Sequence, residues 1–268
     1  MKVLIFWDIY GRMGRKVIES ELSKLKKQYQ ADYVIANIEN CTSWRWPISE
    51  HASYIADLWV DIMTSWDHIY DQKDKISSYL LQENSTLIRP ANFLPYPWNI
   101  WAWYVILQKW DMRLLVIQLI GEAFMSHKVD NPFLKLQEIL AIIPRESYDA
   151  CVVDFHRETT AEIYGLWKYF DGEISLIYWT HTHIQTSDAH IMKWGTGIIA
   201  DVWMNGPHDG VIGADPKTVF PRFLSGIQRW KIEQELSGLA VVSALYVVIN
   251  TENGLCIHIE PIRYTFKL

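Results

Sequence analysis

Short apolar runs alternate along this chain with amphipathic stretches, and this alternation constrains the fold more than any other feature. Runs such as Val3–Phe6 and Ala150–Val153 have the length and composition of buried strands. The segment Arg15–Tyr29 instead repeats apolar residues at helical spacing, beginning with Ile18 and Leu22, with lysines on the opposite face. Strands that alternate with helices are typical of α/β proteins, so we expect that fold class.

The same patterns place the individual elements. The expected strands are Val3–Phe6, Tyr33–Ala36, Val60–Met63, Leu114–Ile120, Ala150–Val153, Ile174–Tyr178, Gly197–Ala200, Ala240–Asn250 and Gly254–Ile262. The expected helices are Arg15–Tyr29, Phe133–Ile143 and Thr159–Phe170, and the proline-containing segment Asn92–Trp103 is expected to be a loop. Because no linker-like stretch or long charge run divides the chain, we expect residues 1–268 to form a single domain.

Composition excludes several classes of function. Half of the residues are hydrophobic, which is enough for a sizeable core, and the net charge of -6 argues against a surface that coats extended nucleic acid. The three cysteines are scattered, as expected for incidental thiols in a reducing compartment. No apolar run reaches the roughly 18 residues of a membrane span, and the N-terminus lacks the pattern of a signal peptide. We therefore expect a cytoplasmic protein without a membrane partner.

Polar side chains follow five of the expected strands. Each strand is followed by a carboxylate, amide or imidazole group, and ligands bind at the carboxyl edge of open α/β sheets. If these strands share a sheet, their ends converge on one site. The residues concerned are Asp8, Glu39, Asn40, Asp67, His156, His181 and His183.

The types of these seven side chains indicate the chemistry. Oxygen and imidazole ligands without a thiolate suit Mn, Fe or Zn in a catalytic site. Seven candidates are too many for one catalytic ion, whereas two ions about 3.5–4 Å apart need roughly this number, with one carboxylate shared. Such a pair activates water and stabilises phosphoryl displacement. The pattern therefore predicts a two-metal phosphoesterase.

Each residue also has a less specific interpretation. Asp8 alone could cap a helix, Glu39 and Asn40 could lie in a solvated loop, and His156 alone could be structural. The pair His181 and His183 is the stronger signal. The remaining histidines are expected to be surface or structural residues: His51, His127, His190, His208 and His258. Amidohydrolases also bind metal through a His-x-His pair, but after the first strand, whereas here the pair follows a late strand.

The chain resembles the YmdB-like branch of the calcineurin-like metallophosphoesterases over nearly its whole length. The matching stretches are Asp8-Ile9-Tyr10-Gly11, Asn37-Ile38-Glu39-Asn40, Asp67-His68-Ile69-Tyr70-Asp71, Arg89-Pro90-Ala91-Asn92, Val153-Asp154-Phe155-His156, Asp171-Gly172, Thr180-His181-Thr182-His183-Ile184-Gln185-Thr186 and Asn205-Gly206-Pro207. The long histidine motif with its flanks is the most specific of these.

The resemblance implies a four-layer αββα sandwich and a dinuclear iron or manganese site. One ion would take Asp8, Glu39, Asn40 and His183, and the other Glu39, Asp67, His156 and His181. A metal-activated hydroxide would attack the phosphorus while His68, as general acid, protonates the leaving oxygen. The implied substrates are phosphodiesters, especially cyclic nucleotides such as 2′,3′-cAMP, and the implied assembly is a homo-oligomer.

Asp67 departs from this resemblance, because the family normally has Asn there. Asp still supplies a ligand oxygen, but its charge favours metal binding and repels an anionic phosphate. This departure leaves an alternative open, a metal-binding regulatory protein with little or no turnover.

The number of tryptophans is the oddest feature of the composition. The chain has 14 Trp against 13 Gly, whereas average usage of about 7% would give roughly 19 glycines. Compared with the family pattern, glycine is expected at Trp7, Trp44, Trp46, Trp59, Trp66, Trp98, Trp101, Trp103, Trp179, Trp194 and Trp203, while Trp110, Trp167 and Trp230 are left open. Some bacterial lineages read UGA as glycine and others read it as Trp. The alternative is a genuinely Trp-rich protein that stacks aromatic rings around a base.

Overall fold

Two mixed β-sheets form the centre of the protein in the computed structural model, which describes residues 1–42, 46–94, 102–226 and 231–268. The first sheet has the order β11-β12-β1-β2-β3-β4, with β13 paired to β12. Its strands are β1 (Lys2–Phe6), β2 (Tyr33–Asn37), β3 (Ile62–Thr64), β4 (Leu87–Ile88), β11 (Gly206–Pro207), β12 (Ala240–Asn250) and β13 (Leu255–Phe266).

The second sheet has the order β5-β6-β7-β8-β10-β9. Its central strands are parallel, whereas β5 and β9 run antiparallel to their neighbours. Its strands are β5 (Tyr104–Lys109), β6 (Met112–Ile120), β7 (Ala150–His156), β8 (Leu176–Thr180), β9 (His190–Ile191) and β10 (Gly197–Ile199).

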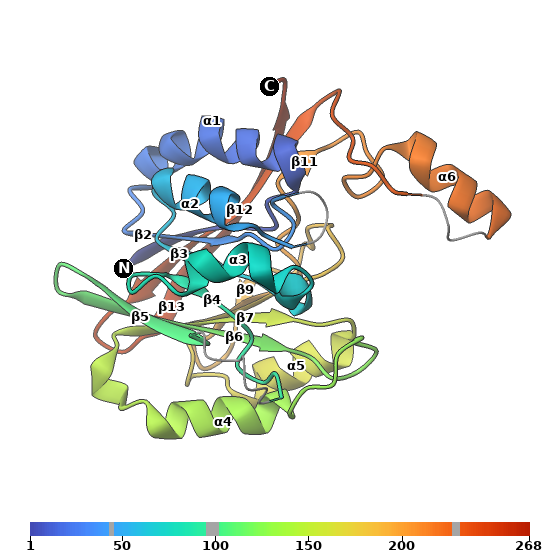
Figure 1. Ribbon diagram of the computed structural model, residues 1–268. Coiled ribbons are helices and arrows are strands. Elements are labelled where there is room, and N and C mark those ends of the chain that lie inside the picture. Colours follow the sequence, from blue (N-terminus) through green and yellow to red (C-terminus); the bar gives the residue numbers. More distant parts are fainter. Residues whose placement is uncertain (43–45, 95–101, 227–230) are drawn as a thin grey trace.

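Helices cover the outer faces of both sheets (Figure 1). The first sheet carries α1 (Gly11–Tyr29), α2 (Ser49–Asp57) and α3 (Lys73–Leu80), and the second carries α4 (Pro132–Ile142) and α5 (Thr160–Tyr169). Helix α6 (Pro216–Ser225) stands away from the sheets, and two short 3-10 turns are η1 (Asp67–Tyr70) and η2 (Arg145–Ser147).

Strand alternation explains why four layers form. Successive side chains of a strand point to opposite faces. Val3 and Ile5 therefore enter the core between the two sheets, while Leu4 packs against the helices outside. In β6, Leu114 faces the same inter-sheet core and Leu115 faces the outer core with α4 and α5. The αββα sandwich expected from the resemblance is confirmed.

The sequence predicted most of the central elements but missed the short ones. The expected helix Arg15–Tyr29 begins earlier, at Gly11, and the strand expected at Ala150–Val153 continues to His156. The missed elements are α2, α3, α6, β4, β5, β9 and β11, most of which are too short to show a clear period. Most of the expected loop Asn92–Trp103 lies outside the described residues.

The site was predicted on the condition that its strands share one sheet, and this condition was wrong. The five strands that precede the candidate ligands do not share a sheet, because β1, β2 and β3 belong to one sheet and β7 and β8 to the other. The two sheets pack face to face, and the carboxyl ends of these strands lie at the same end of the molecule. The candidate residues therefore gather where two sheet edges meet.

Two further findings concern the described residues. No helix within them is long and apolar enough to cross a membrane. Cys41, Cys151 and Cys256 are free and buried, as expected for incidental thiols.

Candidate metal centre

Asp8 lies at the turn that follows β1 and is almost fully buried. Its backbone has a φ of 27°, in the left-handed region that Asp tolerates better than most residues. Asn40 donates its side-chain amide to Asp8 Oδ1 at 2.8 Å, and His183 Nε2 lies 2.9 Å from Oδ2. Asp8 does not cap α1, since the cap position is Tyr10 and no side chain caps it. The capping interpretation is therefore not needed.

Glu39 follows β2 and is fully buried at the middle of the candidate site. Its carboxylate accepts the backbone N–H groups of Trp66 at 2.9 Å and His68 at 2.5 Å. Burial raises the pKa of Glu39 well above its ordinary value, and the nearby charge of Asp67 raises it further. A buried carboxylate of this kind is stabilised by a cation at its free lone pairs.

Asp67 opens the short turn η1 and faces two histidines. Its Oδ1 lies 3.7 Å from His156 Nε2, its Oδ2 lies 3.6 Å from His127 Nδ1, and the Ser126 hydroxyl donates to Oδ2 at 3.3 Å. Burial opposes ionisation of Asp67, but the hydrogen bond with His127 and the charge of His156 prevail and lower its pKa. Asp67 is thus held as a carboxylate beside His156.

The loop after β8 carries two further imidazoles toward this cluster. The ring of His181 lies with Nδ1 3.3 Å from His156 Nε2, and its Nε2 contacts the carboxylate of Glu158. The loop is fixed by Thr182, which donates its backbone N–H at 2.9 Å and its hydroxyl at 2.6 Å to the buried Asp201.

The imidazole of His183 lies between a backbone carbonyl and Asp8. Its Nδ1 donates to the carbonyl of Ile212 at 3.2 Å, and its Nε2 lies 2.9 Å from Asp8 Oδ2. Burial opposes protonation of His183, but the charge of Asp8 and the hydrogen bond with it prevail and raise its pKa. The backbone of His183 has a φ of 60°. Left-handed conformations in residues other than glycine cost free energy and cluster at functional sites, and both Asp8 and His183 adopt one here.

His68 lies next to this cluster without belonging to its buried centre. Its side chain is partly exposed, and its Nδ1 lies 2.8 Å from Asp71 Oδ2. Its backbone N–H is bound to Glu39, so the ring is anchored beside the buried carboxylates. A partly exposed imidazole with a carboxylate behind it is suited to exchange a proton with a bound molecule.

The side chains at this end of the molecule are of types that bind metal ions in proteins. Three carboxylates gather with three imidazoles, and the buried His156 Nδ1 has no hydrogen-bond partner. The side chains mostly pair with one another, however, and within the described ranges no three His, Cys, Asp or Glu side chains are grouped closely enough to hold an ion as they stand. The indole of Trp66 also stacks on the His156 ring, with centroids 4.3 Å apart and an angle of 17°.

Sequence reasoning missed several residues that contact the candidate ligands. His127 was expected to be a surface or structural residue, yet it lies against Asp67. Glu158 contacts His181, and its position two residues after His156 was the only signal that could have suggested it. Asp201 holds the histidine loop from 19 residues away in the sequence, a distance that no local pattern reveals.

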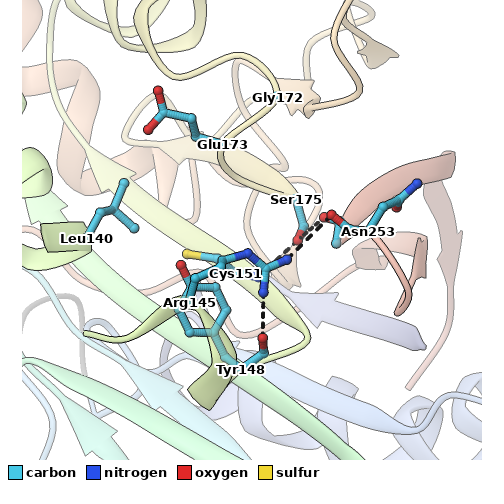
Figure 2. A pocket seen from close by; sticks show the side chains of 9 residues that line it. Leu140, Arg145, Tyr148, Cys151, Gly172, Glu173, Ser175 and Asn253 are labelled. Atoms are coloured by element: carbon cyan, nitrogen blue, oxygen red, sulfur yellow. Dashed lines mark hydrogen bonds between the residues drawn. The ribbon is translucent and has the colours of Figure 1, made fainter. Parts of the chain in front are cut away.

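A separate hollow of about 280 Å³ lies at the opposite end of β7 (Figure 2). Arg145 crosses it and donates to the carbonyls of Tyr148 at 2.6 Å and Asn253 at 3.4 Å. Cys151 in its wall is five residues from His156, which is roughly 16 Å along a strand. This hollow is therefore not part of the candidate metal centre.

Comparisons with known proteins define the class. The chain is 31% identical over 263 residues to the 2′,3′-cyclic-nucleotide 2′-phosphodiesterase of Bacillus subtilis (strain 168), covering 98% of this chain and 96% of that protein. The crystal structure of a phosphatase of Mycoplasma pneumoniae superposes with a TM-score of 0.91 at 29% identity, covering 99% of this chain and 93% of the other. A structure of a hypothetical protein from Thermus thermophilus gives a TM-score of 0.88 at 29% identity, covering 99% of both chains.

The fold and these relatives define a phosphoesterase of the metallophosphoesterase type. Within that class, the model of the YmdB-like proteins matches residues 4–262, and the chain belongs to this family.

Proposed function

We propose that this protein hydrolyses phosphodiesters, with cyclic nucleotides such as 2′,3′-cAMP as its substrates, at a dinuclear metal centre. The single observation that carries the proposal is the gathering of the carboxylates and imidazoles of two sheets at one end of the sandwich. The name of the Bacillus subtilis relative supplies the class of substrate. Residues 1–268 would act as one catalytic domain in the cytoplasm.

The proposed ligands divide into two sets that share Glu39. The first comprises Asp8, Glu39, Asn40 and His183, and the second comprises Glu39, Asp67, His156 and His181. Their oxygen and nitrogen donors suit iron or manganese. When bound, such ions supply Lewis-acid stabilisation of the phosphoryl group and a water of lowered pKa.

The chain's own residues supply orientation and a proton. His68 would donate its proton to the leaving oxygen, and Asp71 would hold the ring through its contact of 2.8 Å. Asp201 would keep the histidine loop in place through Thr182, so that both imidazoles stay directed at the centre. Ile212 would fix the tautomer in which His183 Nε2 is free to ligate.

Metal analysis combined with a substrate screen tests the proposal. The purified protein, loaded with manganese or iron, is offered 2′,3′- and 3′,5′-cyclic nucleotides and a chromogenic phosphodiester. We expect about two ions per chain and hydrolysis of 2′,3′-cAMP. The variant Glu39→Gln should lose both ions and activity, whereas Glu138→Gln in a surface ion pair with Lys135 serves as the control.

The same experiment separates the alternative function. Two bound ions without turnover on any diester would favour a metal-binding regulatory protein. Turnover that persists in the metal-free protein and in Glu39→Gln would overturn the proposed centre.

A further inference from the structure

Four tryptophans have a backbone conformation that suits glycine. The φ values are 41° at Trp46, 71° at Trp59, 54° at Trp110 and 80° at Trp203. Within the described ranges, nine residues other than glycine have a positive φ, and these four Trp are among them, although only 14 of the 268 residues are Trp. A bulky residue in this region is a steric outlier, whereas glycine enters it without cost.

Two of these positions have recognisable roles in local structure. Trp59 lies two residues after the end of α2, and its N–H donates to the carbonyl of Ala56 at 3.0 Å. Helices commonly end on a left-handed glycine at this position. Trp110 is the first of two residues that connect β5 to β6, and Asp111 beside it has no positive φ. Glycine is the usual residue at the first position of such a two-residue hairpin.

Burial of the indole side chains contributes little free energy that would offset this backbone strain. The side chains of Trp59 and Trp110 are 74% and 71% exposed. Trp203 has a buried Nε1 that lacks a hydrogen-bond partner. An unpaired buried N–H group is unfavourable, so the indole adds a second cost to that of the backbone.

Two more tryptophans crowd the candidate metal centre. Trp66 stacks on the ring of His156 and also lies 6.1 Å from the ring of Trp7, which is fully buried. The Nε1 atom of Trp7 is buried without a hydrogen-bond partner. Each residue follows a strand end directly before a candidate ligand, Asp8 or Asp67, where the backbone must approach the site closely.

We infer that these positions carry glycine in the protein as its own organism makes it, and that their codons are UGA. The set comprises Trp7, Trp46, Trp59, Trp66, Trp110 and Trp203. The low glycine content of the printed sequence agrees with this replacement. Glycine at Trp66 leaves one face of His156 open, so that its imidazole and Asp67 have room to close around an ion. At Trp46, Trp59, Trp110 and Trp203 the inference stands on backbone conformation. At Trp7 and Trp66 it stands on the crowding of the candidate centre, and at none of the six does it depend on the proposed substrate. Trp44, Trp98, Trp101 and Trp230 lie outside the described residues and add nothing to it.

The gene and the native protein test this inference directly. We expect UGA at all six codons, and tandem mass spectrometry of peptides from the native protein should read glycine at each position. UGG codons would overturn it, and so would native peptides in which Trp46, Trp59, Trp110 and Trp203 are read as tryptophan. Neither readout requires the protein to fold in a foreign host.

A recombinant comparison adds an independent readout. One chain carries Trp at the six positions and the other carries glycine, and the unfolding midpoint of each is measured by calorimetry. We expect the glycine chain to melt at least about 10 °C higher, because several strained residues are relieved together. An equal or lower midpoint would contradict the inference. The control Phe220→Gly, an exposed aromatic in α6, should instead lower the midpoint by about 2–4 °C.

Discussion

His68 Nδ1 lies 2.8 Å from the carboxylate of Asp71, one turn further along the chain. The pair is partly exposed, while the backbone N–H of His68 is bound to the buried Glu39. The carboxylate of Asp71 therefore orients the imidazole, and the backbone hydrogen bond to Glu39 holds His68 beside the candidate centre. This arrangement is what a proton donor to a leaving group needs.

Replacing His68 with Ala should reduce turnover of a phosphodiester with a poor leaving group by about 10²–10⁴-fold. A nitrophenyl ester should lose much less, because its leaving group needs little protonation. Metal content, measured by atomic emission, should stay unchanged, and a loss of metal would show that His68 is a ligand instead. His258→Ala is the control, since His258 forms a similar pair with Glu260 on β13.

Replacing Asp67 with Asn tests the effect of the extra charge. Asp67 is held as a carboxylate beside His127 and His156, so the substitution removes one negative charge from the centre. We expect metal affinity, measured by isothermal titration calorimetry, to fall by at least about tenfold, because ligand charge sets affinity. The KM for an anionic diester should fall as well, since a repulsive charge is lost. Unchanged affinity would mean that the charge of Asp67 does not contribute to metal binding.

Glu158 should act on the centre through His181. A carboxylate that contacts the far nitrogen of a ligand histidine fixes the orientation of its ring. Glu158→Gln should therefore reduce metal affinity or activity by about 10–100-fold. The same measurements on Glu162→Gln, which leaves His181 untouched, should show a smaller change. Equal losses in the two variants would argue for a general effect on the fold.

Asp149 should contribute to stability in a pH-dependent way. Hydrogen bonds from the side chain and backbone of Arg113, at 2.8 and 2.7 Å, lower the pKa of Asp149 in the folded protein. Because the folded pKa lies below the unfolded value of about 3.9, the contribution is complete above that value and disappears as pH falls through the folded pKa. Asp149→Asn should melt below the parent protein at about pH 6, and thermal scans should show this difference shrinking below about pH 4. A constant difference across that range would contradict the assignment.

The sequence by itself determined the elements and the chemistry that they carry. The apolar runs at Val3 and Leu114 predicted the central strands because alternation and length are local properties, and the same holds for the periodic face of α1. Carboxylates and imidazoles placed directly after strands, such as Asp8 and His156, indicated metal chemistry for the same reason. Short elements such as α2 and β9 escaped because they contain too few residues to show a period.

Only the tertiary structure decided how these parts meet. The strand that precedes Asp8 and the strand that ends at His156 belong to different sheets, and a pattern along one chain does not reveal which strands pair. The contact of His127 with Asp67 spans 60 residues, and that of Asp201 with Thr182 closes a loop, so both depend on packing. The tryptophans illustrate the same division. Their number was visible in the composition, but the positive φ at Trp59 and Trp110 exists only once a helix has ended and a hairpin has closed.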